Sequence, residues 1–184
     1  MRRGVFPGSF DPPTVAHVAI AEAARAHARL DRLDLAVSRV ALAKEHRALH
    51  DDRLALLHRL RTARPWLGVV VTDAQLVVDV AQGYDVVVMG ADKWAQVRDP
   101  AWYGSERERD AALARLPRVL VAPRAGYSVE GAETLPLDAR LGEVSSSAVR
   151  DGAHHWIAPE ARPADRGGRD ERDRQPARRL VARP

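Results

Sequence analysis

The apolar positions of the chain form short continuous runs that alternate with amphipathic segments. Runs rich in Val, Leu and Ala are typical of strands buried on both faces of a parallel sheet. The predicted strands cover residues 2–6, 33–42, 66–72, 84–89 and 119–122, with a short sixth over 134–137. The predicted helices cover residues 14–30, 51–62, 75–82, 106–115 and 145–150. This alternation indicates an α/β fold with a parallel sheet of about five strands.

The last part of the chain differs in composition from the rest. Residues 159–184 are mostly Arg, Asp, Gly and Pro, with few side chains that a core could bury. Because burial would not offset the entropy lost on ordering, we expect one domain over residues 1–158 and a disordered tail over 159–184. A frameshifted end and a nucleic-acid-binding arm are alternatives, and the acidic residues between the arginines disfavour the arm.

Composition excludes several classes of protein. The chain has 184 residues, 46% of them hydrophobic, which is enough for one domain with a core. It has no cysteine, so disulfides and thiolate metal sites are excluded, and no apolar run has the length of a membrane span. The first strand leaves no room for a signal peptide, so we expect a cytoplasmic protein without a membrane partner. The net charge of +4 comes largely from the tail, so we expect no nucleic-acid partner.

The junction of the first strand and the first helix has the composition of an anion-binding turn. The strand ends in GSFDPP (residues 8–13), and a helix opens at Thr14 with His17 in its first turn. Loop N–H groups and the helix dipole can bind a phosphate that approaches closely at Gly8, while Thr14 caps the helix. His17 can donate an N–H to a phosphate oxygen. Taken alone, the stretch is better explained as a tight turn with a surface histidine.

Polar residues also follow the other predicted strands. The carboxyl ends of parallel strands share one edge of the sheet, where open α/β sheets bind ligands. These strand-end residues are Ser9, Phe10, Lys44, Gly90, Asp92, Lys93 and Arg124. The last predicted helix begins with three serines. Because Ser147 and Arg150 share one face of that helix, a hydroxyl and a guanidinium can bind the same phosphate chain.

Residues 8–17, GSFDPPTVAH, resemble the GxFDPxHxGH signature of the HIGH-type nucleotidyltransferases. Members of this superfamily transfer a nucleoside monophosphate from a triphosphate to a phosphate-bearing acceptor. Thr14 stands where many members have a histidine, although phosphopantetheine adenylyltransferases also carry a threonine there. Ala16 replaces the usual glycine. The resemblance implies a Rossmann-like three-layer sandwich of the HUP type. The implied ATP-binding residues here are Gly8, Ser9, Phe10, Thr14 and His17.

Residues 145–150, SSSAVR, resemble the second signature of the superfamily, ISSTxxR. A serine-rich helix start followed by an arginine is common when taken alone. Two signatures at opposite ends of the fold indicate the superfamily much more strongly than either one does. The implied triphosphate-binding residues are Ser145, Ser146, Ser147 and Arg150.

The middle of the chain resembles nicotinate or nicotinamide mononucleotide adenylyltransferases. Gly90 and Asp92 match a Gly-x-Asp element whose carboxylate accepts hydrogen bonds from ribose, although a plain strand-end turn is the alternative. Trp102 matches a tryptophan that stacks on the pyridine ring, with Trp94 as a second candidate. Arg124 begins a segment similar to an Arg-Pro-Gly-Tyr element and would pair with the acceptor's phosphate, with a simply exposed arginine as the alternative.

The chain has only two lysines, Lys44 and Lys93. Lys44 follows the second predicted strand, where the resembled enzymes have a lysine that contacts the acceptor or the triphosphate. The resemblance thus implies His17, Lys44 and Arg150 as the catalytic set. Residues 73–84 lack the Ser-Tyr-Thr segment with which those enzymes hold the pyridine carboxylate, so the acceptor is less certain than the reaction type.

The expected reaction is adenylyl transfer from ATP to a mononucleotide phosphate, foremost nicotinate mononucleotide, with release of pyrophosphate in NAD biosynthesis. Mg²⁺ is the expected cofactor, held by substrate phosphates rather than by protein ligands. The alternatives are a cytidylyltransferase, a phosphopantetheine adenylyltransferase, or a non-catalytic nucleotide-binding relative. A homo-oligomer is left open.

Overall fold

The computed structural model describes residues 1–39 and 50–162. Within them, six parallel strands form one sheet in the order β3-β2-β1-β4-β5-β6. The strands are β1 (Arg3–Pro7), β2 (Arg32–Ser38), β3 (Leu67–Thr72), β4 (Val86–Gly90), β5 (Arg118–Ala122) and β6 (Glu133–Thr134). The α-helices are α1 (Val15–Ala28), α2 (His50–Ala63), α3 (Val77–Val80), α4 (Ala91–Arg98), α5 (Glu106–Leu113) and α6 (Ser146–Arg150). Short 3₁₀ turns are η1 (Pro100–Trp102), η2 (Ala139–Glu143), η3 (His154–Trp156) and η4 (Pro159–Ala161).

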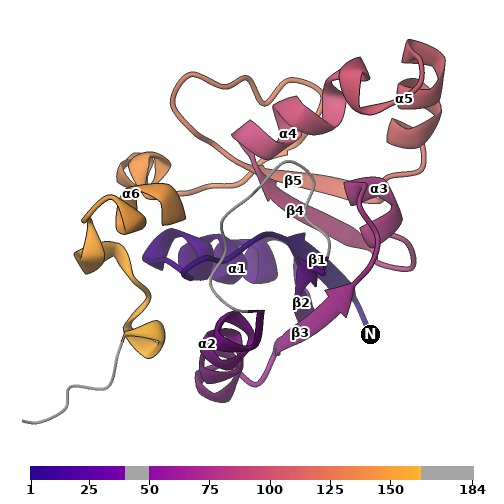
Figure 1. Ribbon diagram of the computed structural model, residues 1–184. Coiled ribbons are helices and arrows are strands. Elements are labelled where there is room, and N and C mark those ends of the chain that lie inside the picture. The colour runs from indigo at the N-terminus through magenta and orange to yellow at the C-terminus, as the bar shows by residue number, and fades with distance from the viewer. Residues whose placement is uncertain (40–49, 163–184) are drawn as a thin grey trace, which may run out of the picture.

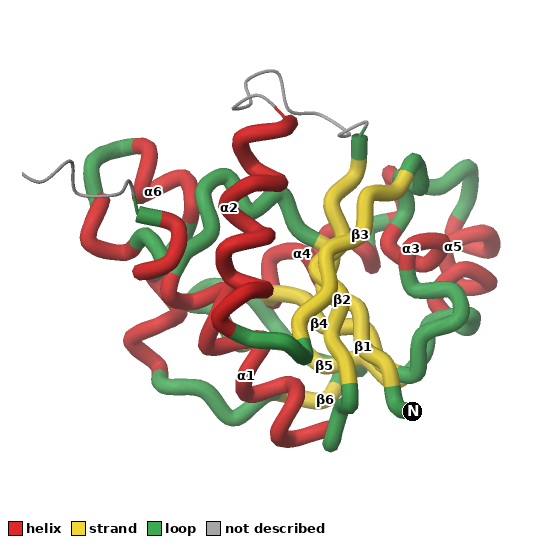
Figure 2. The backbone as a smooth tube through the Cα atoms, turned by 90° about the horizontal axis from the view of Figure 1, so that it is seen from below, coloured by secondary structure: helices red, strands yellow, loops and turns green. Residues whose placement is uncertain are grey.

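The molecule has three layers, as predicted. Helices α1 and α2 cover one face of the sheet, and α3, α4 and α5 cover the other (Figures 1 and 2). Strand β4 shows why a continuous apolar run was needed. Val86 and Val88 belong to the core under α1 and α2, whereas Val87 and Met89 belong to the core under α3 and α4. Both faces of the strand are therefore buried, and every position of the run contributes to a core.

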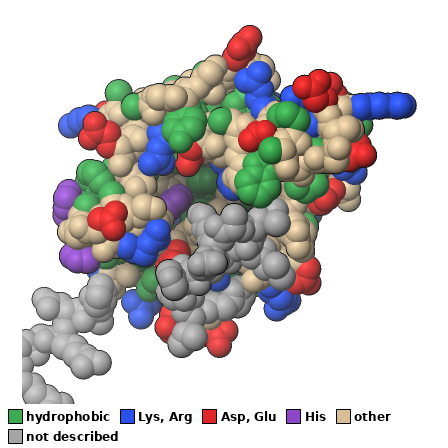
Figure 3. Space-filling view, turned by 45° about the horizontal axis from the view of Figure 1, so that its top comes forward, with side chains coloured by type: hydrophobic (Ala, Val, Ile, Leu, Met, Phe, Trp, Pro, Cys, Tyr) green, Lys and Arg blue, Asp and Glu red, His purple; other side chains and the backbone are tan. Residues whose placement is uncertain are grey.

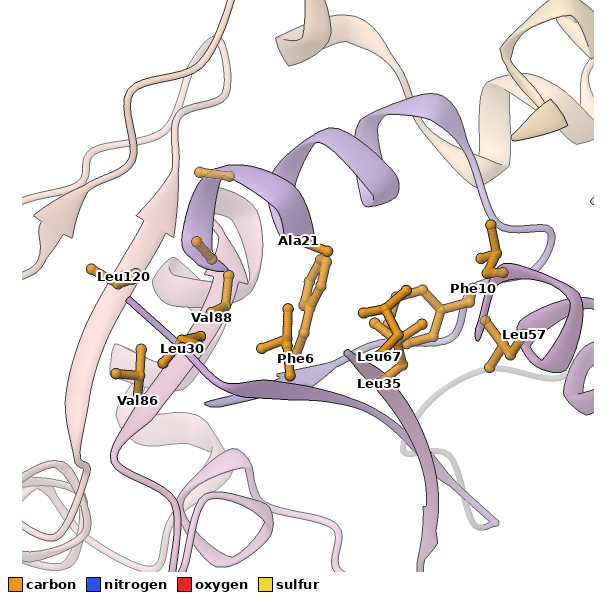
Figure 4. Close-up of a cluster of buried hydrophobic side chains, with 14 of the residues drawn as sticks. Phe6, Phe10, Ala21, Leu30, Leu35, Leu57, Leu67, Val86, Val88 and Leu120 are labelled. Atoms are coloured by element: carbon orange, nitrogen blue, oxygen red, sulfur yellow. The ribbon is translucent and has the colours of Figure 1, made fainter. Parts of the chain in front are cut away.

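The core on the α1 and α2 side also holds the loop after β1. In Figure 4, Phe6 lies against Ala21 of α1, and Phe10 lies beside Leu57 of α2. Phe6 and Phe10 meet edge to face, with ring centroids 5.3 Å apart. The buried Phe10 ring thus anchors the loop between β1 and α1 to the core.

The strand order places the ligand crevice. Chain progression reverses direction between β1 and β4, which are hydrogen-bonded neighbours at the centre of the sheet. In open parallel sheets the crevice at such a reversal, outside the carboxyl ends of the strands, is where ligands bind. The segments that follow β1, β4 and β5 therefore converge there.

Several predicted elements differ in extent from the structure. Helix α3 is a single turn, and β6 has two residues rather than four. Strand β2 ends at Ser38, and residues 40–42 of the predicted strand lie outside the described residues. Helix α4 was not predicted, and half of its eight residues are polar. It forms because Ala91, Trp94 and Val97 recur at helical spacing and are buried against the sheet.

The packed chain continues past the boundary expected at residue 158. In η4, Ala161 is buried, and Glu160 accepts a hydrogen bond of 2.6 Å from Arg64 at the end of α2. The rest of the expected tail, residues 163–184, lies outside the described residues. Within residues 1–39 and 50–162, no helix has the length and apolar character required to cross a membrane.

Candidate active site

A cavity of about 350 Å³ opens at the carboxyl ends of the strands, within the size range of small-molecule sites. Figure 3 shows the face on which it opens, with Lys and Arg side chains at the border of the hollow. Most of the predicted site residues line it. They are Gly8, Ser9, His17, Gly90, Asp92, Trp102, Arg124, Ser145, Ser146, Ser147 and Arg150. Lys44, also predicted, lies outside the described residues.

Phe10 and Thr14 were predicted to bind ATP, but both side chains are fully buried and do not line the cavity. The Phe10 ring sits in the core, and its backbone adopts a φ of 47°. Such a left-handed conformation is unfavourable for a bulky residue, and core packing offsets it. Gly8 is required beside it, because a Cβ at Gly8 would lie 2.7 Å from the Phe10 ring.

The loop still presents backbone N–H groups that an anion could use. The Gly8 N–H donates to the Ala36 carbonyl at 3.0 Å and extends the pairing of β1 with β2. The N–H groups of Ser9 and Phe10 donate to no acceptor within the described parts of the chain. Two N–H groups at a strand-to-helix junction, next to the positive end of α1, form an arrangement suited to phosphate.

Thr14 and His17 form a capping box at the start of α1. The Thr14 N–H donates to Nδ1 of His17 at 3.0 Å, and the Thr14 hydroxyl lies 2.9 Å from the same nitrogen. In return, the His17 N–H donates to the Thr14 hydroxyl oxygen at 3.4 Å. Because Nδ1 accepts from a backbone N–H, it carries no proton, and the proton of the neutral ring lies on Nε2. His17 is thereby prepared as an N–H donor.

Burial strengthens this preference for the neutral ring. Desolvation beside the packed aromatic rings lowers the pKa of His17 to about 4; the nearby Asp92 charge opposes this shift, and the Arg124 charge adds to it more weakly. The imidazole is therefore uncharged at neutral pH. It can donate one hydrogen bond to a phosphate oxygen without carrying a charge of its own.

The two signature segments are in direct contact. The Ser146 hydroxyl donates to the Pro12 carbonyl at 2.8 Å, across a sequence separation of 134 residues. Arg150 donates to the Asp11 carbonyl and, at 3.0 Å, to the Ser147 hydroxyl. Figure 1 shows α6 beside α1 in the position that these bonds require. The start of α6 and the loop after β1 thus form one continuous polar wall.

The ends of β4 and β5 contribute a pair of opposite charges. Asp92 and Arg124 each follow their strand by two residues, and their side chains approach to 3.8 Å. Among the described residues that line the cavity, the charged side chains are one carboxylate, Asp92, and four cations, which are three arginines and Lys93. The excess of positive charge suits a ligand with several phosphates.

The opposite wall is largely apolar. Leu76, Val77 and Val97 line the cavity there together with Trp102 and Tyr103, whose hydroxyl donates to the Val97 carbonyl at 2.9 Å. Trp94, the second candidate for stacking, is instead buried in the core, and its indole N–H donates to the Glu130 carbonyl. Trp102 is therefore the tryptophan that faces the cavity.

Sequence reasoning missed Arg53, which lines the cavity from α2 and is 2% exposed. A signal for it exists in the sequence. Leu57 and Leu60, the two buried leucines of α2, lie four and seven residues after Arg53, so Arg53 occupies the same helical stripe. An arginine on the apolar stripe of a helix predicts a guanidinium that is buried when the helix packs on the sheet.

The residues present fit Mg²⁺ only as a companion of phosphate. Within the described residues, no group of three or more His, Asp or Glu side chains could hold an ion. Mg²⁺ is usually bound through substrate phosphates and waters with one or two carboxylates, and Asp92 supplies one such group.

Comparison with known proteins agrees with this geometry. A family model described as cytidylyltransferase-like matches residues 5–152. A phosphopantetheine adenylyltransferase of Micrococcus luteus is 30% identical over 153 residues, or 82% of this chain and 85% of that protein. A probable nicotinate-nucleotide adenylyltransferase of Chlorobaculum parvum is 45% identical over 60 residues, or 33% of this chain and 31% of that protein.

A second probable nicotinate-nucleotide adenylyltransferase, from Bordetella avium, is 39% identical over 79 residues, which are 40% of this chain and 38% of that protein. The chain therefore matches less than half the length of the two relatives with this name. The family match, by contrast, contains all of the cavity-lining segments from β1 to α6. The chain belongs to the cytidylyltransferase-like family of nucleotidyltransferases.

Proposed function

We propose that the protein transfers the adenylyl group of ATP to the phosphate of a mononucleotide, foremost nicotinate mononucleotide, and releases pyrophosphate. One observation carries the proposal. The loop after β1 and the start of α6 meet through Ser146 and Arg150 and together line a positively charged cavity at the switch point of the sheet. A polyphosphate ligand fits that wall by charge and by its number of donors.

In the proposed reaction, a phosphate oxygen of the acceptor attacks the α-phosphorus of ATP, and the bond to the bridging oxygen of pyrophosphate breaks. The substrates supply both nucleophile and leaving group, so the protein contributes position and charge. His17 donates from Nε2 to an oxygen on which negative charge develops. Mg²⁺ that arrives with ATP neutralises part of the phosphate charge.

The remaining polar residues would bind the triphosphate. The N–H groups of Ser9 and Phe10 serve as donors from the loop, and Ser147 and Arg150 serve from α6. Gly90 and Asp92 would border the nucleotide, with the carboxylate accepting from ribose hydroxyls. Lys44 keeps its expected role of contacting the phosphates as a prediction from the sequence.

The acceptor would occupy the apolar wall. Trp102 offers a flat surface for a pyridine ring, and Arg124 offers a charge for the acceptor's phosphate at the end of β5. Arg124 would then exchange its partner Asp92, 3.8 Å away, for the phosphate. Two relatives bear the name of nicotinate-nucleotide adenylyltransferase, which supports this choice of acceptor.

Phosphopantetheine is the second candidate acceptor. The Micrococcus luteus relative, which is named for that activity, matches 82% of the chain. Such enzymes also carry a threonine at the position of the signature that Thr14 occupies at the start of α1. The extended arm of phosphopantetheine would lie along the wall formed by Leu76 and Val97 rather than stack on Trp102.

The test is pyrophosphate release by the purified protein with Mg²⁺, with ATP and CTP each combined with nicotinate mononucleotide, nicotinamide mononucleotide and phosphopantetheine. We expect turnover with ATP and nicotinate mononucleotide, and a fall in turnover for Trp102→Ala. Turnover with phosphopantetheine alone would select the second candidate. Turnover only with CTP would refute adenylyl transfer, and no turnover in any combination would refute both candidate acceptors.

A further inference from the structure

Among the described residues, Arg53 is a buried charge that lines the cavity. Within the described residues, the buried polar side chains are Thr14, Asp34 and Arg53. Thr14 caps α1, and Asp34 is paired with arginines on β1 and β2. Neither lines the cavity, whereas Arg53 does. Burying a guanidinium is costly, and Arg53 places this charge at the border of the cavity.

Arg53 contacts the loop that the proposed function assigns to phosphate. Its NH1 group donates to the Ser9 carbonyl at 3.4 Å. One turn further along α2, Leu57 packs in the same core cluster as Phe10, and Figure 4 shows the two side by side. Helix α2 therefore contacts this loop at two successive residues, through a polar bond to one and an apolar contact with the other.

The contact with Ser9 also sets the direction of a donor. In a planar trans peptide, the carbonyl of one residue and the N–H of the next point in opposite directions. Because the Ser9 carbonyl faces Arg53, the Phe10 N–H points away from that guanidinium. This N–H is one of the two loop donors without an acceptor in the described chain. Rotation of this peptide would replace the donor with a carbonyl oxygen, which repels phosphate.

We propose that Arg53 is a positioning residue for the triphosphate. It holds the Ser9–Phe10 peptide in the orientation that offers an N–H to a phosphate oxygen, and its buried positive charge favours the same anion. The inference rests on the proposed function, since it assumes that ATP occupies this cavity. It adds a residue of α2 to a site otherwise built from the strand ends and from the starts of α1 and α6.

The test measures binding of ATP with Mg²⁺ by titration calorimetry at neutral pH, well below the unfolding temperature of each variant. The variants are Arg53→Ala and Arg53→Lys, with Arg61→Ala as the matched control. Arg61 is an exposed arginine of the same helix that does not line the cavity. We expect Arg53→Ala to bind ATP about 10- to 100-fold more weakly and Arg61→Ala to bind like wild type.

Two further readouts separate positioning from general support of the fold. We expect Arg53→Lys to retain part of the affinity, and millimolar guanidinium to restore ATP binding to Arg53→Ala but to leave Arg61→Ala unchanged. Wild-type affinity in Arg53→Ala would overturn the inference. So would a loss that neither lysine nor guanidinium repairs, because that result indicates a purely structural role. If Arg53→Ala does not fold, wild-type affinity in Arg53→Lys overturns it.

The same experiment tests the proposed function separately. If the wild-type protein binds no ATP, the proposed function fails and this inference falls with it. If wild type binds ATP and both Arg53 variants bind it as tightly as wild type does, only the role of Arg53 is refuted.

Discussion

The capping box at the start of α1 predicts a measurable dependence of stability on pH. In the folded protein, Nδ1 of His17 accepts the Thr14 N–H, and burial lowers the pKa of the ring to about 4 from an ordinary value of 6.5. Between these two values the unfolded chain binds a proton at His17 that the folded protein excludes. The free energy of unfolding therefore falls as the pH falls through this range.

The size of the effect follows from the two pKa values. A difference of about 2.5 pH units corresponds to about 3 kcal/mol when the transition is complete. By about pH 5 the loss relative to neutral pH is about 2 kcal/mol. The contribution is fully present above pH 6.5 and is lost as the pH approaches 4, which is the sign expected for a histidine buried in its neutral form.

The matched variant is His17→Gln, because glutamine at this position can still accept the Thr14 N–H and complete a capping box. We expect the variant to lie within about 1 kcal/mol of wild type at neutral pH. From about pH 7.5 to pH 5, wild type should lose about 2 kcal/mol more than the variant, since carboxylates titrate alike in both proteins. Urea unfolding at a series of pH values measures this difference.

Two results would refute the reasoning. Parallel stability curves for wild type and His17→Gln down to pH 5 would show that His17 is not buried in its neutral form. A pKa near 6.5 for the His17 ring by NMR would show the same directly. Where wild type is active, we expect His17→Gln to lower kcat about 100-fold and to change ATP affinity much less. Equal losses in both would make His17 a ground-state binding contact.

Three further variants test other parts of the structure. Gly68→Ala should destabilise the protein by about 3 kcal/mol in urea unfolding, because the new Cβ would overlap the Asp34 carboxylate and break its buried ion pairs. Leu57→Ala should cost about 2 to 5 kcal/mol in the same assay, since it leaves a cavity against Phe10. Arg150→Lys should weaken ATP binding about tenfold by calorimetry, because the forked contact is lost; unchanged affinity would place ATP elsewhere.

The sequence predicted the sheet well because its strands depend on local composition. A run such as the one that contains Val86, Val88 and Met89 has no polar position, so it can form only a strand or helix buried on all sides. Turn residues on either side then separate the strand from its neighbours. Helix α4 could not be predicted in this way. Its burial depends on Trp94 reaching the sheet and bonding to Glu130, which lies 36 residues further along the chain.

The sequence motifs contain residues that line one cavity, but they do not show how these residues contact the rest of the fold. The motifs located Ser9, His17 and Arg150, which line one cavity. They did not reveal that the Phe10 side chain would turn into the core, where it belongs to the same cluster as Leu57 of a different helix. Nor could they show that Arg53 would meet the Ser9 carbonyl. Each of these facts is a contact across tens of residues, which neither spacing nor resemblance reports.

The central claim is that the cavity transfers an adenylyl group, and the fate of the ATP phosphates tests it most directly. Purified protein with Mg²⁺ and nicotinate mononucleotide would be incubated with ATP labelled at either the α- or the γ-phosphate. The account predicts that the α label appears in the dinucleotide product and that the γ label leaves as pyrophosphate. A γ label transferred to the acceptor, or an α label that never leaves ATP with this acceptor or with phosphopantetheine, would contradict it.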